Sequence, residues 1–207
     1  ELYTDHTNID HRQFALFNFD NTNALNNGTY TNLQKARVSA EDAVRRLEKY
    51  HGAAAATRLN PAIAHAYAGY AYVLLGEHFC EAPIDVGPAV SSQVLLQKGV
   101  EHFNRAITVA AASSGTGVNG LDGARVRNLA NLGAARASLQ MGAMQEAIRF
   151  AQQVDAGFEE SVYRSDNSAR EQNIIGVQWS TTGQWLSVDP AFQFLGDPRV
   201  RPTRQPR

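Results

Sequence analysis

Glu77, His78 and Cys80 place a carboxylate, an imidazole and a thiol within four positions of one another. Such a group suggests either a metal site or a thiolate activated by a neighbouring base. Both readings need further ligands, and these would have to come from His51, His65 or His102, which are far away in the sequence and show no pattern that brings them together. We therefore interpret Glu77–Cys80 as an ordinary helix-to-loop junction.

Two other patterns suggest ligand-binding loops. Gly115, Gly117 and Gly120 have the spacing of a dinucleotide-binding loop, but an alanine-rich helical segment precedes them where such a loop needs a strand. Asp5, Asp10 and Asp20 lie among asparagines, yet no stretch has the alternating oxygen ligands, glycine and distal glutamate of an EF-hand. We expect neither a cofactor nor a metal site.

Catalytic signatures are also missing from the sequence. No G-x-S-x-G passage occurs, and no pair of carboxylates stands in an apolar setting that would raise one pKa for acid catalysis. We expect a protein that binds and does not catalyse.

Trp179 and Trp185 are the candidate ligand-binding residues. Indole faces stack on sugar rings, whose axial C–H groups offer a matching apolar surface. The alternative is that both tryptophans only anchor an irregular C-terminal region to the rest of the protein.

Charge and composition exclude several classes of protein. The chain has 207 residues, with 19 Lys and Arg against 20 Asp and Glu, so no strong field favours nucleic acid. The lone Cys80 excludes an internal disulfide, and no apolar run is long enough for a membrane span. Because the sequence starts at Glu1, we expect a processed or partial polypeptide.

Hydrophobic periodicity predicts a mainly all-α chain with an irregular, loop-rich C-terminal segment. A stripe recurring every three or four residues predicts one helix over 31–50, ended by Gly52, although Ser39 and Asp42 resemble a capping box. Asn60, as a cap before Pro61, starts a second helix that runs to about Phe79. Further expected segments are a loop over 80–90, a helix from Ser91 and Ser92 to before Ser113, a flexible connector over 113–123, helices over 124–141 and 143–154, and short strands over 174–179 and 184–188.

Small residues at helix spacing predict a tetratricopeptide-like α-solenoid. In the second helix Ala62, Ala66, Gly69 and Val73 form a strip that allows close approach of another helix. Repeat-like spacings occur in two sets: Gly69, Tyr72 and Gly76 with Gly99, Phe103 and Ala106, and then Gly142, Ala147, Ala151 and Val154. We expect a loop-rich lead-in over 1–30, helical repeats over 31–157, and an irregular segment over 158–207 that starts a missing C-terminal region.

The passage Ala66–Asp85, AYAGYAYVLLGEHFCEAPID, resembles the SusD/RagB family, whose members commonly carry AY-x-x-LG-x-x-FG-x-x-P where a helix enters a loop. The stretches 33–50, 102–113 and FQFLGDPRV are similar in character to other parts of that family. The sequence departs from the family at Cys80, where many members have glycine. It also lacks the lipidated N-terminal cysteine and the long C-terminal region.

The resemblance implies a surface lipoprotein of the bacterial outer membrane that delivers oligosaccharides or peptides to a TonB-dependent, SusC-like transporter. It also implies that the membrane is reached only through a lipid anchor outside this chain. Two alternatives remain open: a structural helical-repeat scaffold in a surface assembly, and an accessory glycan-processing enzyme.

We predict that at least one of the two tryptophans contacts ligand. The double variant Trp179→Ala, Trp185→Ala should then bind glycan more weakly, because the stacking surface is removed. Glycan titration followed by calorimetry checks this, with circular dichroism showing that the variant is folded. Unchanged binding by a folded double variant would remove the hypothesis.

Overall fold

The computed structural model describes residues 2–3, 22–161, 164–165, 167–168, 172 and 187–188. The chain divides into two compact units, Thr29–Glu160 and a discontinuous one made of Glu1–Gly28 and Ser161–Arg207. In the second of these, β1 (Leu2–Tyr3) pairs antiparallel with β4 (Ser187–Val188). The predicted strand over 184–188 is thus present at Ser187–Val188 with β1 as its partner, and the predicted strand over 174–179 lies outside the described residues.

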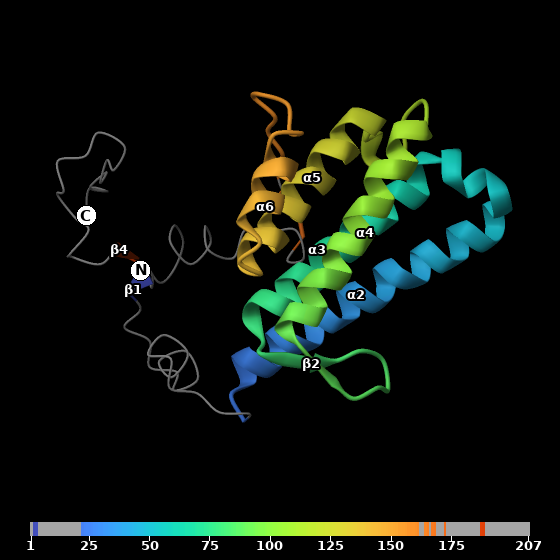
Figure 1. The fold of residues 1–207 in the computed structure, drawn as a ribbon. Coiled ribbons are helices and arrows are strands. Elements are labelled where there is room, and N and C mark those ends of the chain that lie inside the picture. The colour runs from blue at the N-terminus through green and yellow to red at the C-terminus, as the bar shows by residue number, and fades with distance from the viewer. Residues whose placement is uncertain are drawn as a thin grey trace, which may run out of the picture. The chain divides into compact units, whose positions relative to one another are not determined.

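The described chain is mainly helical, as predicted (Figure 1). Its helices are α2 (Ala24–His51), α3 (Leu59–His78), α4 (Ser92–Ala112), α5 (Gly123–Gln140) and α6 (Met144–Ala151), with 3-10 turns at Gly52–Thr57 and Val118–Gly120. As predicted, α2 runs unbroken through Ser39, and Gly52 follows it with a φ of +55°.

Two helix starts differ from the prediction. Helix α2 begins at Ala24 instead of Thr31, because the side chain of Asn23 accepts a hydrogen bond from the backbone N–H of Asn26 at 3.1 Å and caps the first turn. Helix α3 is capped at Arg58 without a side-chain hydrogen bond. Asn60 instead accepts a hydrogen bond from the backbone N–H of Val118 at 3.0 Å.

Two predicted loops are more ordered than expected. The segment after α3 forms a β-hairpin of β2 (Glu81–Pro83) and β3 (Ala89–Ser91). Pro83 is tolerated because it ends β2 in a two-stranded sheet, where a missing N–H costs little. The 113–123 connector is held by a hydrogen bond from Gly117 N to Leu121 O at 2.7 Å and by its bond to Asn60.

Helices α3, α4 and α5 pack around the ring of Phe103, which is fully buried on α4. A Cβ atom built on Gly69 of α3 would lie 2.7 Å from Phe103 Cε1, and one built on Gly133 of α5 would lie 2.3 Å from Phe103 Cζ. Tyr70 meets the same ring edge-to-face at a centroid distance of 5.0 Å. The small-residue strip of α3 therefore permits the close helix approach that the sequence predicted.

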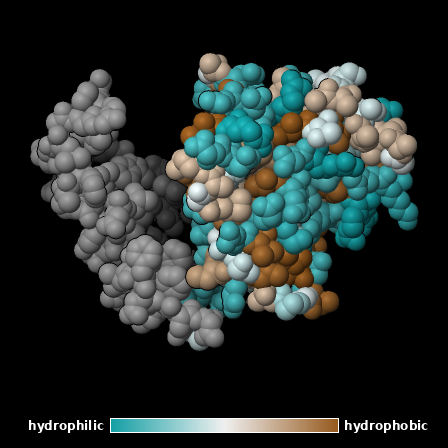
Figure 2. Space-filling model, viewed as in Figure 1, coloured by the Kyte–Doolittle hydropathy of each residue, from teal (hydrophilic) through white to brown (hydrophobic). Residues whose placement is uncertain are grey.

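Contacts between α3 and α5 show that these two helices run parallel, with α4 antiparallel to both. Tyr70 OH donates to Leu129 O at 2.8 Å, and Arg136 donates two hydrogen bonds of 2.6 Å to Glu77, so both contacts join residues 59 positions apart. Among the coloured residues of Figure 2, hydrophilic side chains cover much of the face shown, broken by separate apolar patches. Among the described residues, no helix has both the length and the apolar character needed to cross a bilayer.

We predict that Gly133→Ala lowers the free energy of unfolding by roughly 1–3 kcal/mol, because the new methyl group would overlap the enclosed Phe103 ring. Gly28→Ala is the matched control, since nothing lies within 4 Å of its Cβ position in α2. That change should raise stability by roughly 0.5–1 kcal/mol through helix propensity alone. Urea unfolding checks both; a Gly133→Ala protein as stable as the control would contradict the packing described.

Candidate functional site

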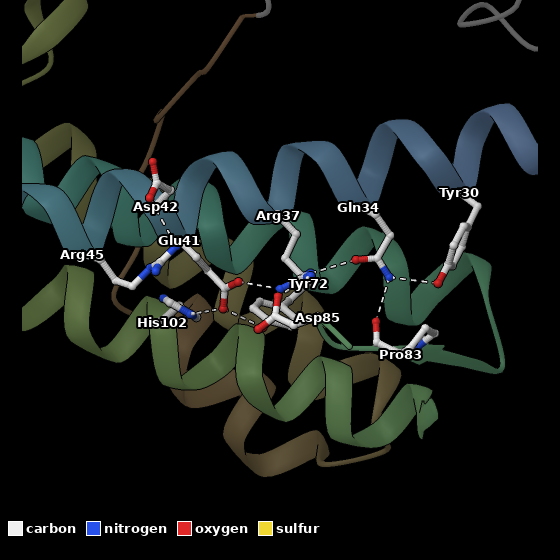
Figure 3. Close-up of polar contacts among 10 residues, drawn as sticks. All are labelled: Tyr30, Gln34, Arg37, Glu41, Asp42, Arg45, Tyr72, Pro83, Asp85 and His102. Atoms are coloured by element: carbon white, nitrogen blue, oxygen red, sulfur yellow. Dashed lines mark hydrogen bonds and ion pairs between the residues drawn. The ribbon is translucent and has the colours of Figure 1, made fainter. Parts of the chain in front are cut away.

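Arg37 is the centre of a polar network between α2, the hairpin and α3 (Figure 3). Its side chain is only 2% exposed. The guanidinium donates from Nε to Gln34 at 2.8 Å, from Nη1 to Glu41 at 2.5 Å and from Nη2 to Asp85 at 3.1 Å. All three of its nitrogens are therefore hydrogen-bonded, which compensates for the loss of water around a buried charge.

Gln34 joins this network to the hairpin. Its Nε2 donates to the carbonyl oxygen of Pro83 at 2.9 Å and to the hydroxyl of Tyr30 at 3.0 Å. Asp85, which accepts from Arg37, lies in the hairpin turn with a φ of +54° and remains 70% exposed on its side chain. The hairpin is thus fastened to α2 through one backbone carbonyl and one carboxylate.

The network continues to α4 through Glu41. Tyr72 OH donates to Glu41 Oε1 at 2.7 Å, and the Tyr72 ring stacks on His102 with a centroid distance of 5.6 Å. His102 Nε2 lies 3.9 Å from the same carboxylate oxygen. One carboxylate of α2 therefore accepts from Arg37 and Tyr72 and lies near His102.

His65 and His102 meet with their Nδ1 atoms 3.0 Å apart. This distance requires one ring to carry its proton on Nδ1 and the other to accept there, so the pair is not doubly charged. His65 Nε2 is buried without a hydrogen bond; its nearest carboxylate oxygen, on Glu48, lies at 3.5 Å. Within the described part of the chain, no three His, Cys, Asp or Glu side chains are grouped to hold a metal ion.

Burial and neighbouring charge set the protonation of these groups. Burial, reinforced by the charge of His102, lowers the pKa of His65 to about 4, and burial also lowers the pKa of His102. For Arg37, burial opposes the charged form, but the hydrogen bond to Asp85 and the charge of Glu41 outweigh it and raise the pKa. At neutral pH the network holds a charged arginine beside two neutral histidines.

A groove of about 510 Å³ borders the network on the side of α2 and the hairpin. It is lined by Tyr30, Thr31, Gln34, Lys35, Arg37, Val38, Ser39, Pro83 and Asp85. The tyrosine ring, a lysine and an exposed carboxylate are groups that bind polar ligands such as sugars or peptides.

The structure places the sequence-predicted candidates differently. Trp179 and Trp185 lie outside the described residues. Glu77 is held by Arg136, His78 Nδ1 lies 2.8 Å from Leu74 O, and Cys80 is exposed.

No sequence pattern indicated contact between the distant histidines, yet His65 and His102 lie together. Among the described residues they form no metal-binding group with Glu77, His78 or Cys80. Sequence reasoning missed them because α3 and α4 place them together only after folding. A local signal existed in part: Glu41 and Glu48, and likewise His65 and Tyr72, are seven residues apart and so share a helix face.

Comparison of the chain with protein-family models, curated proteins and solved structures found no match. The mainly helical architecture is established by the structure itself. Any assignment of the chain to a family depends on the sequence resemblance alone.

We predict that His65 makes the protein less stable as pH falls from about 6.5 towards 4. The lowered folded-state pKa means that the unfolded chain takes up the proton first, so the stabilisation is complete above the unfolded pKa of 6.5 and is lost below it. For one such group the loss approaches about 1.4 kcal/mol per pH unit in this range. Urea unfolding, repeated from about pH 7 to about pH 4.5 in steps of roughly half a pH unit, measures this loss of stability.

The comparison that isolates His65 uses two variants. His65→Gln should flatten the pH dependence more than the control variant His78→Gln, which alters an exposed histidine. An equal slope in His65→Gln and the unaltered protein would contradict the assignment.

Proposed function

We propose that this chain is the helical part of a non-catalytic nutrient-binding protein on the bacterial outer-membrane surface. It would deliver an oligosaccharide or peptide to a TonB-dependent, SusC-like transporter and be anchored by lipid attached outside this chain. The observation that carries the proposal is the passage Ala66–Asp85, with its Leu-Gly-Glu-x-Phe exit from a helix.

The folding of this passage supports the proposal, because each part of it has a defined role. Gly76 lets α4 approach, since a Cβ there would lie 2.9 Å from Leu96 Cγ. Phe79 ends α3 and packs edge-to-face against Tyr30 with a centroid distance of 5.1 Å. Ala82 is fully buried in the hairpin, and Asp85 reaches Arg37. The passage therefore builds a fixed junction beside the groove.

The arrangement of helices also favours a repeat protein. Parallel α3 and α5, with an antiparallel helix following each, form two helix pairs stacked in the same sense, as in tetratricopeptide arrays. Repeats of this kind expose extended surfaces suited to a large partner. On this basis we propose that the helices of this chain form a tetratricopeptide-like array.

The decisive experiment is affinity purification of the tagged full-length protein from detergent-solubilised membranes of its own bacterium. We predict that a large β-barrel transporter co-purifies at a fixed ratio, because delivery requires a stable complex. An unrelated tagged surface lipoprotein of the same cells controls for non-specific capture. Ordered self-association without a barrel would contradict the proposal and favour the scaffold function; turnover of a glycan would favour an enzyme.

A further inference from the structure

A second pocket, of about 290 Å³, lies among α4, α5, α6 and the turn that follows α6. It shares no lining residue with the groove beside Arg37. Most of its lining side chains carry amide, guanidinium or carboxylate groups, and Ile107, Ala124 and Phe150 supply the apolar part. A concave site with several convergent polar groups is the kind that binds a small polar ligand.

Asn131 of α5 is the most informative residue in this pocket. Its side chain borders the cavity although the residue is only 6% exposed, and it forms no hydrogen bond within the described chain. Its amide carries two donor hydrogens and an acceptor oxygen, and these are open to the pocket and not enclosed by protein. The pocket is therefore the place where a partner for Asn131 would bind.

Arg127 lies one turn before Asn131 on the same face of α5 and borders the same cavity. It is half-buried and has neither an ion pair nor a hydrogen bond among the described residues. Arg149, by contrast, donates two hydrogen bonds to Glu146 and lies over the ring of Phe150 at 4.1 Å. Of these two guanidinium groups, that of Arg127 is the one free to bind an anion.

A reciprocal pair joins α5 to the turn after α6 at this pocket. Asn128 Nδ2 donates to Asp155 Oδ2 at 2.8 Å, and the backbone N–H of Asp155 donates to Asn128 Oδ1 at 2.9 Å. The remaining Asp155 oxygen forms no hydrogen bond within the described chain and can accept from a ligand hydroxyl or N–H. The pocket thus offers an unpaired cation, an unpaired amide and an acceptor in fixed positions.

We propose that this pocket binds the carboxylate group of a small ligand, with Arg127 and Asn131 donating to the carboxylate and Asp155 accepting from a neighbouring donor. A guanidinium fork matches a carboxylate in shape and charge, which favours this group over a neutral sugar. Two sources share the chemistry: a sugar acid and the C-terminus of a short peptide. The site goes beyond the proposed import role and depends only on contacts within 104–155, so either can fail without the other.

The test is a titration of the ¹⁵N-labelled full chain, followed by amide chemical shifts, with four probes. D-glucuronate is compared with neutral D-glucose, and triglycine with triglycine amide. We expect a carboxylate-bearing probe to shift the amides of α4, α5 and α6 around the pocket, and its neutral counterpart to leave them in place. Shifts with glucuronate alone assign a sugar acid, and shifts with triglycine alone assign a peptide terminus.

Variants test the residues. Arg127→Gln and Asn131→Leu should each weaken binding about tenfold or more, because each removes donors to a charged group. Arg105→Gln on the exposed side of α4 changes the net charge equally and should leave binding unchanged. The spectrum of each variant reports whether it is folded, and the partial exposure of Arg127 keeps that variant informative if Asn131→Leu does not fold. Equal shifts with neutral probes, equal weakening by Arg105→Gln, or no shift near the pocket would overturn the proposal.

Discussion

The seating of one aromatic ring between two glycines is the constraint on which the rest of the helical unit depends. Phe103 contacts α3 at Gly69 and α5 at Gly133, positions where any side chain would collide with the ring. Because the ring is fully buried, it fixes the rotation of α4 about its own axis. His102 and Asn104 flank it in sequence and project to different sides of α4, His102 towards the polar network and Asn104 towards the second pocket.

The polar network attaches α2 to the rest of the helical unit. This helix meets α3, α4 and the hairpin through long side chains centred on Arg37 and Glu41, in place of the close glycine contacts used by α3 to α5. A buried charge stabilises only when its hydrogen bonds are satisfied, and removal of one partner leaves the other uncompensated. The network therefore specifies one register of α2 against the hairpin, and it keeps the groove beside Arg37 in a fixed shape.

Local signals in the sequence were sufficient for much of the fold. Periodicity located the helices, Ser91 capped α4 as expected, and Gly142 broke α5 from α6 with a φ of +76°. The early start of α2 was missed because an asparagine-rich stretch has loop composition, while one side-chain cap at Asn23 decides the outcome. The hairpin was missed because two prolines argued for a loop, whereas pairing of Glu81–Pro83 with Ala89–Ser91 makes it a sheet.

The candidate sites were less accessible to sequence reasoning. His65 contacts His102, and Arg127 shares a pocket with Asp155. Both pairs join residues far apart in the chain, so no local sequence pattern predicts them. Trp179 and Trp185 remain a prediction from residue chemistry alone. Composition indicates which groups can bind a ligand, but the packing of helices decides which of them share a pocket.

The most direct test of the central claim is a double-mutant cycle between Gly69→Ala and Phe103→Leu, measured by urea unfolding. If the ring fills the space above Gly69, the shorter leucine makes room for the added methyl group. The double variant should then be more stable than the sum of the single changes by roughly 1 kcal/mol or more. Additive losses would show that Phe103 does not occupy that space and would contradict the account of how α3, α4 and α5 are held together.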